Sequence, residues 1–204
     1  DPNEPSHVLA LAEAELAEGH EAQASIVLRR LRRSAATPAL GHLQLGQAFA
    51  DHELPRDALA EFDAALRLEP QNLAAMRGRA LSLSHLYRYR DAEAEWQRLL
   101  MSAGGDAERR RDAREQLVEL WAELGELERQ VRDYEDAFGY SAKSGPRHSP
   151  DGFDPPRDPE VGRLLAEGYL RLARQPSYRA QPARYLRGAE DVLGQVVKLE
   201  ASDA

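Results

Sequence analysis

Apolar and small residues recur at helical spacing along residues 39–72 and fall into two stripes. The positions in these stripes are Leu45, Gly46, Phe49, Ala58, Phe62, Ala65 and Leu66. Steps of three, four and seven residues place side chains on one face of an α-helix. Pro55 suits the first turn of a helix, and Pro70 ends one because its ring blocks the backbone ladder. The segment therefore predicts two amphipathic helices joined by a tight turn.

Small residues alternate with aromatic rings in both predicted helices, Gly46 with Phe49 and Ala58 with Phe62. Small residues let two helices approach closely, while the rings fill the space between them. One helix pair buries too little apolar surface to be stable alone, so copies of the pattern are expected elsewhere in the chain.

Similar stripes occur at steps of 34 residues in 5–38 and 73–106, and again in 111–144 after an insertion of four residues. A looser copy spans 159–204, with its second helix displaced by about ten residues. The residues at the matching positions of these copies are Leu11, Ala12, Gly19, Ala24, Leu28, Leu31; Ala80, Leu83, Ala92, Trp96, Leu99, Leu100; Leu117, Trp121, Gly125, Leu127, Tyr134, Ala137; and Leu165, Ala166, Tyr169, Ala189, Leu193, Val196, Val197. Of these, Gly19 and Gly125 are expected at turns between paired helices, where a left-handed conformation costs little. The predicted helices are 4–17, 20–33, 38–51, 55–68, 72–85, 89–102, 106–123, 125–138, 158–173 and 182–199.

Residues 39–72 resemble the tetratricopeptide repeat (TPR) family, which combines a Leu-Gly pair, an aromatic residue three positions later, and Ala, Phe, Ala and Pro in its second half. His42 stands where the family has an early Trp. The resemblance implies an all-α fold, a right-handed α-solenoid of about five helix hairpins that occupies 1–204 as one domain. The motif residues are structural in the family, so they imply no particular partner.

Three features modify this regular picture. Residues 139–158 are rich in turn formers and predict an irregular loop. Arg114 belongs to a cluster of arginines interleaved with acids, which predicts ion pairs on the helix surface. Both ends fall at repeat boundaries, which predicts a segment of a longer chain, and an apolar terminal face would permit self-association.

Composition narrows the classes of function. The formal net charge is −8, which disfavours nucleic acid as a partner because phosphate neutralisation needs Lys and Arg. There is no Cys, so disulfides and thiolate chemistry are excluded. No stretch reaches the ~20 consecutive apolar residues of a membrane-spanning helix. The compartment, cytoplasm or periplasm, stays open.

Motifs for catalysis are not recognisable in the chain. The six His residues show no HExxH or similar ligand spacing, and neither GxSxG nor a P-loop is present. We therefore predict a protein that is not an enzyme, with no catalytic residue, metal site or cofactor.

The resemblance implies that the first helix of each hairpin lines a concave groove. Its outward positions would form a surface for a peptide or a partner protein. These predicted groove residues are Leu9, Glu13, Leu43, Gln44, Gln47, Asp51, Arg77, Leu81, Ser84, His85, Glu119, Arg163 and Glu167, together with Glu115, Glu123 and Arg171.

The interpretation is a non-catalytic protein–protein interaction scaffold, of a kind that bacteria use in assembly. One alternative is an accessory recognition domain of a larger enzyme, which the adjoining gene sequence would reveal. A second is an RNA-binding helical repeat, which the acidic balance and the Gly/Ala/Phe pattern disfavour.

Overall fold

The structure is a computed structural model that describes residues 5–20, 22–24, 26–27, 38–146, 157–176 and 182–202. The chain divides into two compact units, Asp1–Asp106 and Ala107–Ala204, and each is described by itself. Continuation of the two units as one solenoid domain stays a prediction.

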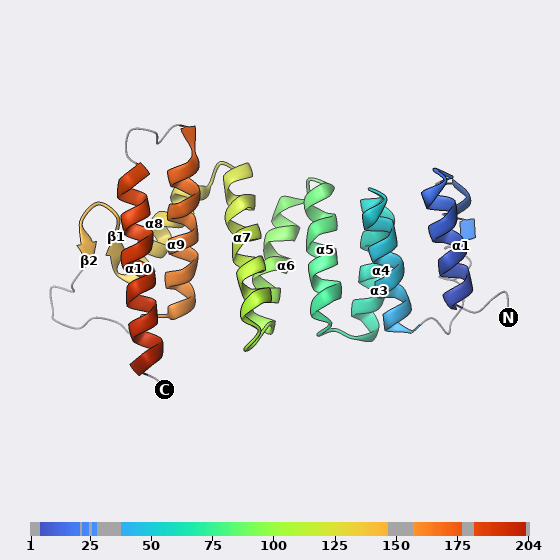
Figure 1. The fold of residues 1–204 in the computed structure, drawn as a ribbon, viewed down its shortest axis with the longest axis horizontal. Coiled ribbons are helices and arrows are strands. Elements are labelled where there is room, and N and C mark those ends of the chain that lie inside the picture. The colour runs from blue at the N-terminus through green and yellow to red at the C-terminus, as the bar shows by residue number, and fades with distance from the viewer. Residues whose placement is uncertain are drawn as a thin grey trace. The chain divides into compact units, whose positions relative to one another are not determined.

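Unit 1 is built from antiparallel helix hairpins. Its helices are α1 (Pro5–Ala17), α3 (Ala39–Asp51), α4 (Pro55–Leu68), α5 (Leu73–His85) and α6 (Tyr89–Ser102), with further helical residues at 22–24 and 26–27. Helix α3 packs on α4, α4 on α5, and α5 on α6, so that successive hairpins share one core (Figure 1).

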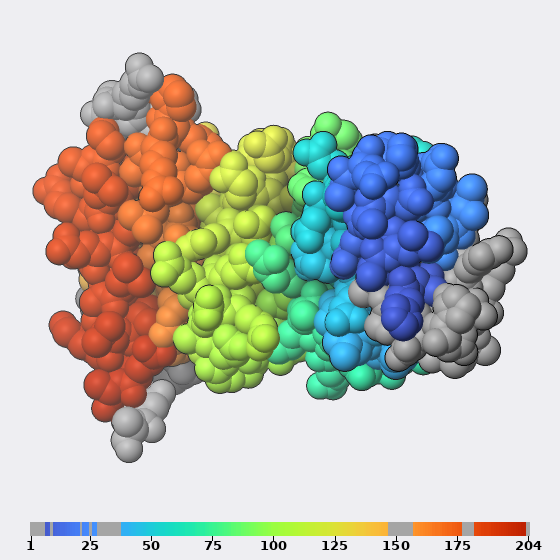
Figure 2. All heavy atoms as spheres, turned by 45° about the vertical axis from the view of Figure 1, so that its right-hand side comes forward, coloured from blue at the N-terminus to red at the C-terminus, as the bar shows by residue number. Residues whose placement is uncertain are grey.

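Unit 2 repeats this arrangement with one addition. Its elements are α7 (Ala107–Glu123), α8 (Leu127–Phe138), β1 (Tyr140–Ser141), β2 (Gly145–Pro146), α9 (Pro159–Arg174) and α10 (Pro182–Ser202). Helix α9 packs against α7, α8 and α10. Figure 2 shows the atoms of α9 and α10, in orange and red, forming a continuous surface. The predicted fold class, an all-α helical repeat of the solenoid type, is confirmed.

The turn between the two helices of a hairpin has the same backbone conformation in four places. Gly19, Glu53, Tyr87 and Gly125 all have a positive φ, between 58° and 79°. They lie 34, 34 and 38 residues apart, the spacings expected from the repeat and its four-residue insertion. Glycine adopts this left-handed conformation freely, whereas Glu53 and Tyr87 adopt it at a cost.

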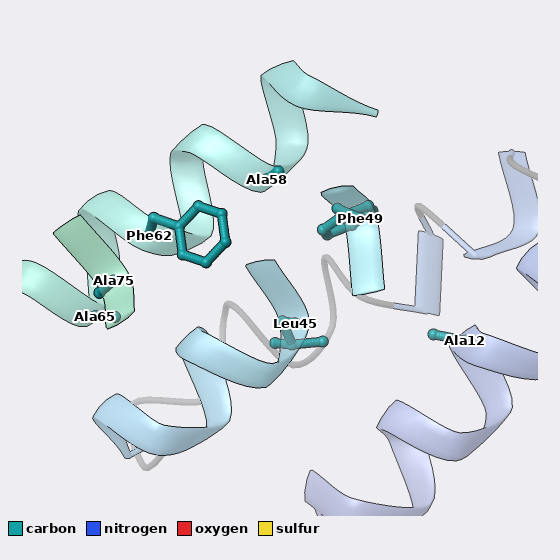
Figure 3. Close-up of a cluster of buried hydrophobic side chains, with 7 residues drawn as sticks. All are labelled: Ala12, Leu45, Phe49, Ala58, Phe62, Ala65 and Ala75. Atoms are coloured by element: carbon teal, nitrogen blue, oxygen red, sulfur yellow. The ribbon is translucent and has the colours of Figure 1, made fainter. Parts of the chain in front are cut away.

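The core of unit 1 centres on Phe62 of α4, whose ring lies between Gly46 of α3 and Gly78 of α5. A Cβ atom added at Gly46 would lie 2.7 Å from Cε1 of this ring, and one at Gly78 would overlap it more severely. The cluster shown in Figure 3 comprises Ala12, Leu45, Phe49, Ala58, Phe62, Ala65 and Ala75. Small residues therefore admit the aromatic ring between neighbouring helices, as the alternation of sizes predicted.

Unit 2 uses the same device with other residues. A Cβ at Gly162 of α9 would lie 2.6 Å from Val196 of α10 and 2.7 Å from Phe138 of α8. A Cβ at Gly168 would lie 2.6 Å from Val131 of α8. Close contact at these two glycines fixes α9 between α8 and α10.

Both tryptophans are buried, as predicted. Trp96 is 0% exposed and Trp121 is 1% exposed. Trp121 lies 5.6 Å from the ring of Tyr134, measured between centroids. The indole Nε1 of Trp96 finds no hydrogen-bond acceptor among the described residues, so packing alone accounts for its burial.

Other predicted core positions prove wrong. Leu11 is 51% exposed, Leu193 is 41% exposed and Val197 is 64% exposed. Ala137 of α8 is exposed as well, because the buried stripe of that helix runs through Leu127, Val131 and Phe138. Leu193 holds the repeat position of Phe62 but has no described helix beyond α10 to cover it.

Two predicted helix starts have different outcomes. Asp158 caps α9 by accepting a hydrogen bond from the Glu160 amide at 2.7 Å, and Pro159 follows in the first turn. Pro38, expected inside the helix, is instead the N-cap of α3. Asn72, which the sequence interpretation passed over, caps α5 by accepting from the Ala75 amide at 3.0 Å.

The segment predicted as an irregular loop begins with an ordered antiparallel hairpin, in which Tyr140 pairs with Pro146 (Figure 1). The Tyr140 hydroxyl donates to Asp191 of α10 at 2.8 Å, and the Tyr169 hydroxyl donates to Glu135 of α8 at 2.6 Å. Burial and the Asp191 hydrogen bond raise the pKa of Tyr140 to about 12. The Ala142 amide in the hairpin turn donates to the Tyr169 hydroxyl at 2.8 Å and to Glu135 at 3.2 Å, so the hairpin is tied to α8, α9 and α10. Residues 147–156 lie outside the described part of the chain.

Within the described residues, no helix combines the length and the apolar character needed to cross a membrane.

The glycine at position 78 tests the close packing around Phe62. We expect Gly78→Ala to destabilise the protein by about 1–3 kcal/mol, because the added methyl group overpacks the ring. Gly194→Ala is the matched control: a Cβ there meets no atom within 4 Å. It should stabilise α10 by roughly 0.5–1 kcal/mol. Urea unfolding followed by circular dichroism measures both, and equal effects of the two substitutions would contradict the packing argument.

The turns with positive φ allow two substitutions whose expected effects on stability are opposite in sign. We expect Gly125→Ala to destabilise by about 1 kcal/mol, since its φ is +69° and its surroundings are open. At the equivalent turn, Glu53→Gly should stabilise by about 0.5–1 kcal/mol because φ there is already positive. The same unfolding measurement compares them. Two changes of the same sign would show that backbone conformation does not dominate at these turns.

Candidate functional site

A hollow between α7 and α9 is the principal candidate site in unit 2. It encloses about 440 Å³, and we name it the α7–α9 groove. Its lining residues are Arg111, Glu115, Val118, Glu119, Glu167, Leu170, Arg171 and Arg174. Both helices are the first helices of their hairpins, so the groove lies on the face where the resemblance placed partner binding.

Ion pairs organise the two walls of the α7–α9 groove. Arg171 of α9 donates from Nε and Nη2 to the two carboxylate oxygens of Glu119 on α7, at 2.7 and 2.9 Å. Arg111 donates to Glu115 one turn along α7, at 2.8 Å. The forked geometry of the first pair fixes both side chains in direction as well as in distance.

Glu167 stands apart from these pairs in its electrostatics. Partial burial and the neighbouring Glu115 carboxylate raise the pKa of Glu167 above its ordinary value of 4.5, although Arg114, Arg111 and Arg174 oppose the shift. The half-buried Leu170 and the buried Val118 add apolar surface to the same groove. The groove thus combines charged groups of both signs with an apolar part, which suits recognition of a peptide segment.

The structure brings only some of the predicted groove residues together. Glu119 and Glu167 line the α7–α9 groove with Glu115 and Arg171. Arg163 is not among the lining residues of the α7–α9 groove, and it pairs instead with Glu200 of α10.

In unit 1 the predicted residues are more dispersed. Leu43 is half-buried and packs against the Phe62 cluster, so part of its surface serves the core. Gln47 donates to Asp51 at 2.8 Å on the exposed face of α3. Glu13, Gln44 and Arg77 are exposed and Leu81 is half-buried, while the side chain of Leu9 lies outside the described part.

A second hollow, of about 440 Å³, lies in unit 1 beside two successive turns. We name it the turn hollow. Its lining residues are Glu53, Pro55, Ser84, His85, Tyr87 and Tyr89. Ser84 and His85 are among the predicted groove residues, whereas Tyr87, Tyr89 and Glu53 were not predicted to belong to any site. The signal that could have found them is the spacing of 34 residues, which aligns Glu53 with Tyr87.

Polar pairs between helices were also missed. His42 Nδ1 lies 2.8 Å from Glu61 Oε2, and both residues are buried. Arg79 donates to Asp63 and to Glu95, each at 2.7 Å. Burial opposes charge on Arg79, but these two carboxylates outweigh it and raise the pKa of Arg79. These pairs link neighbouring helices and thus have a structural role.

Arg114 corrects the prediction of surface pairing. Its side chain is buried and donates to Glu160 of α9 at 2.5 Å. The pair joins α7 to α9, the two helices that form the walls of the α7–α9 groove.

Three groups that could bind a metal approach one another at the end of α1. They are Glu15, Glu18 and His20, and they are largely exposed. His20 Nδ1 lies 3.1 Å from Glu15 and 3.4 Å from Glu18, an arrangement that a surface ion pair explains in full.

The helix hairpins and the groove between first helices define an all-α helical repeat protein. Among solved structures, the MamA RS-1 ArsTM double mutant is similar to 98% of this chain and 96% of its own, at 17% identity and a TM-score of 0.51. A putative kinesin light chain of Podosopora anserina, with nearly identical TPR-like repeats, covers 100% of this chain and 98% of its own, at 14% identity and a TM-score of 0.51. The resemblance to the TPR family is thereby confirmed in the fold.

Sequence comparisons add a shorter similarity. Anaphase-promoting complex subunit 7 of Arabidopsis thaliana is 42% identical over 78 residues, which is 38% of this chain. The chain covers 14% of that relative's length. No protein-family model matches the chain.

Glu167 provides a test of the electrostatics in the α7–α9 groove. A raised pKa means that the folded protein binds the proton more tightly than the unfolded chain, so stability falls as pH rises through that pKa. Glu167→Gln should therefore raise the urea midpoint at neutral pH and lose this gain below about pH 4.

Carbon-13 NMR of the Glu167 carboxyl measures the pKa directly. Glu115→Gln is the partner variant, and it should lower the pKa of Glu167 because it removes the repelling carboxylate. A Glu167 pKa at or below 4.5 in the parent protein would contradict the expected effect of burial and of the Glu115 carboxylate.

Proposed function

We propose that the protein is a protein-interaction module that binds a segment of a partner protein in the α7–α9 groove. The observation that carries the proposal is the forked Arg171–Glu119 pair beside Glu167 in a hollow of about 440 Å³. Helical repeats present their first helices as extended binding surfaces, and the TPR-like fold supports this use here.

The chemistry of the groove favours a partner segment that carries charges of both signs. Three carboxylates and three guanidinium groups line it, so an incoming peptide can contact charged groups of either sign. Val118 and Leu170 add contact for one apolar side chain. Charges placed in this way select partners and orient them more than they add affinity.

The predicted surface of unit 1 belongs to the proposal as a second contact area. Exposed Gln44 and Arg77, together with half-buried Leu81, lie on first helices of unit 1. Two short contact areas on one chain raise apparent affinity when a partner engages both.

An accessory recognition domain of a larger enzyme would use the same groove. The proposal therefore concerns binding, and it assigns no catalytic residue, cofactor or metal to the residues of the groove.

A charge exchange within the groove tests the proposal. Peptides selected from a random library by the parent protein should lose about tenfold or more in affinity for the double variant Glu119→Arg/Arg171→Glu. The exchange keeps an ion pair between α7 and α9, so the fold is preserved, but it reverses the charge pattern that a peptide meets. Fluorescence anisotropy with labelled peptides measures the dissociation constants.

The control exchanges Glu126, the N-cap residue of α8, with Arg129 in the first turn of that helix; the two form an ion pair at 2.9 Å and do not line the groove. This variant should bind the selected peptides as the parent does. Peptides that bind the parent and the groove exchange equally well would refute the proposed site.

A further inference from the structure

Tyr87 combines two unusual features at the turn hollow of unit 1. Its side chain is 80% exposed, although it is a large aromatic residue. Its φ is +58°, in the left-handed region that disfavours a side chain. The equivalent turn positions Gly19 and Gly125 are glycines. The chain thus holds an exposed ring at a position where glycine would be more stable, which points to a use for the ring.

The ring of Tyr87 forms one part of an aromatic wall. Tyr89 lies 6.0 Å away between ring centroids, and the two planes are nearly perpendicular, at 85°. Pro55, at the start of α4, adds an apolar surface to the same hollow. Perpendicular rings present faces in two directions, and the face of an aromatic ring attracts cations.

Two features place negative charge next to the aromatic wall of Tyr87 and Tyr89. The Glu53 side chain lines the hollow and is exposed. Ser84 and His85 bring the C-terminal end of α5 to the hollow, where the helix dipole is negative. Arg88 lies next to Tyr87 in the chain, but it is held by Asp91 at 2.6 Å.

We propose that the turn hollow binds a cationic side chain, arginine or lysine, presented by a partner protein. The ring faces of Tyr87 and Tyr89 contact the cation, and Glu53 pairs with it. Pro55 and His85 bound the hollow and limit the side chain that fits.

This site is separate in residues from the α7–α9 groove, so each can fail without the other. Exchange of Glu119 and Arg171 leaves the turn hollow unchanged, and substitutions at the turn hollow leave the α7–α9 groove unchanged.

Fluorine NMR of the chain labelled with 3-fluorotyrosine tests the proposal. The probe is a blocked pentapeptide with arginine between glycines, and the control peptide has neutral citrulline in place of arginine. Tyr87→Phe and Tyr89→Phe variants assign the two resonances. We expect saturable shifts of both resonances with a dissociation constant on the order of 1 mM. The citrulline peptide should bind at least about fivefold more weakly.

Two variants separate binding from folding. Glu53→Gln should lower the affinity for the arginine peptide by about threefold, as expected for the loss of an exposed ion pair. Tyr87→Gly should abolish the shift at Tyr89 and leave the chain at least as stable, because glycine suits the positive φ.

Several results would overturn the proposal. One is equal binding of the arginine and citrulline peptides. Another is a shift of Tyr134 or Tyr185 in unit 2 as large as that of Tyr87, which would indicate nonspecific contact. A proline-rich peptide that shifts Tyr87 and Tyr89 more strongly than the arginine peptide would assign the hollow to extended proline segments instead.

Discussion

The structure of unit 1 depends on one aromatic ring held between two glycines. Phe62 projects from α4 into the space that Gly46 and Gly78 leave free on α3 and α5. Because both neighbours lack a Cβ, one ring joins a hairpin to the next and sets the distance between their helices. Gly162 serves the same purpose in unit 2, where Phe138 and Val196 approach it from two helices. Close approach at glycine is therefore the constraint from which the stacking of hairpins follows.

This constraint explains how much of the fold the sequence reveals. Helix pairs are predicted well because the same size pattern returns at every step of 34 residues. Prediction fails where burial depends on a neighbour that the pattern does not specify. Leu193 matches Phe62 in position but is exposed, since no described helix covers it. In α8 the buried stripe ends on Phe138 and not on Ala137, because Phe138 is the side chain that meets Gly162.

The candidate sites were harder to predict than the fold. Glu119 and Glu167 were found because the family resemblance assigns outward positions on first helices, and these two helices lie side by side. Arg114 is only five residues before Glu119 in the sequence, yet it is buried against Glu160. Its partner lies 46 residues away, a separation that helical periodicity does not encode. Buried pairs such as His42–Glu61 escape sequence reasoning for the same reason.

The turns show where the repeat leaves freedom for function. Packing fixes the residues that face a neighbouring helix, and it fixes the backbone conformation of the turn between two helices. It does not fix the side chain at the turn, because that position points away from the core. Glycine would satisfy the backbone at all four turns, and two of them nevertheless have other residues. At Tyr87 the exposed ring gains little from packing beyond its contact with Tyr89, and this cost in backbone conformation is the reason for proposing that the ring contacts a partner.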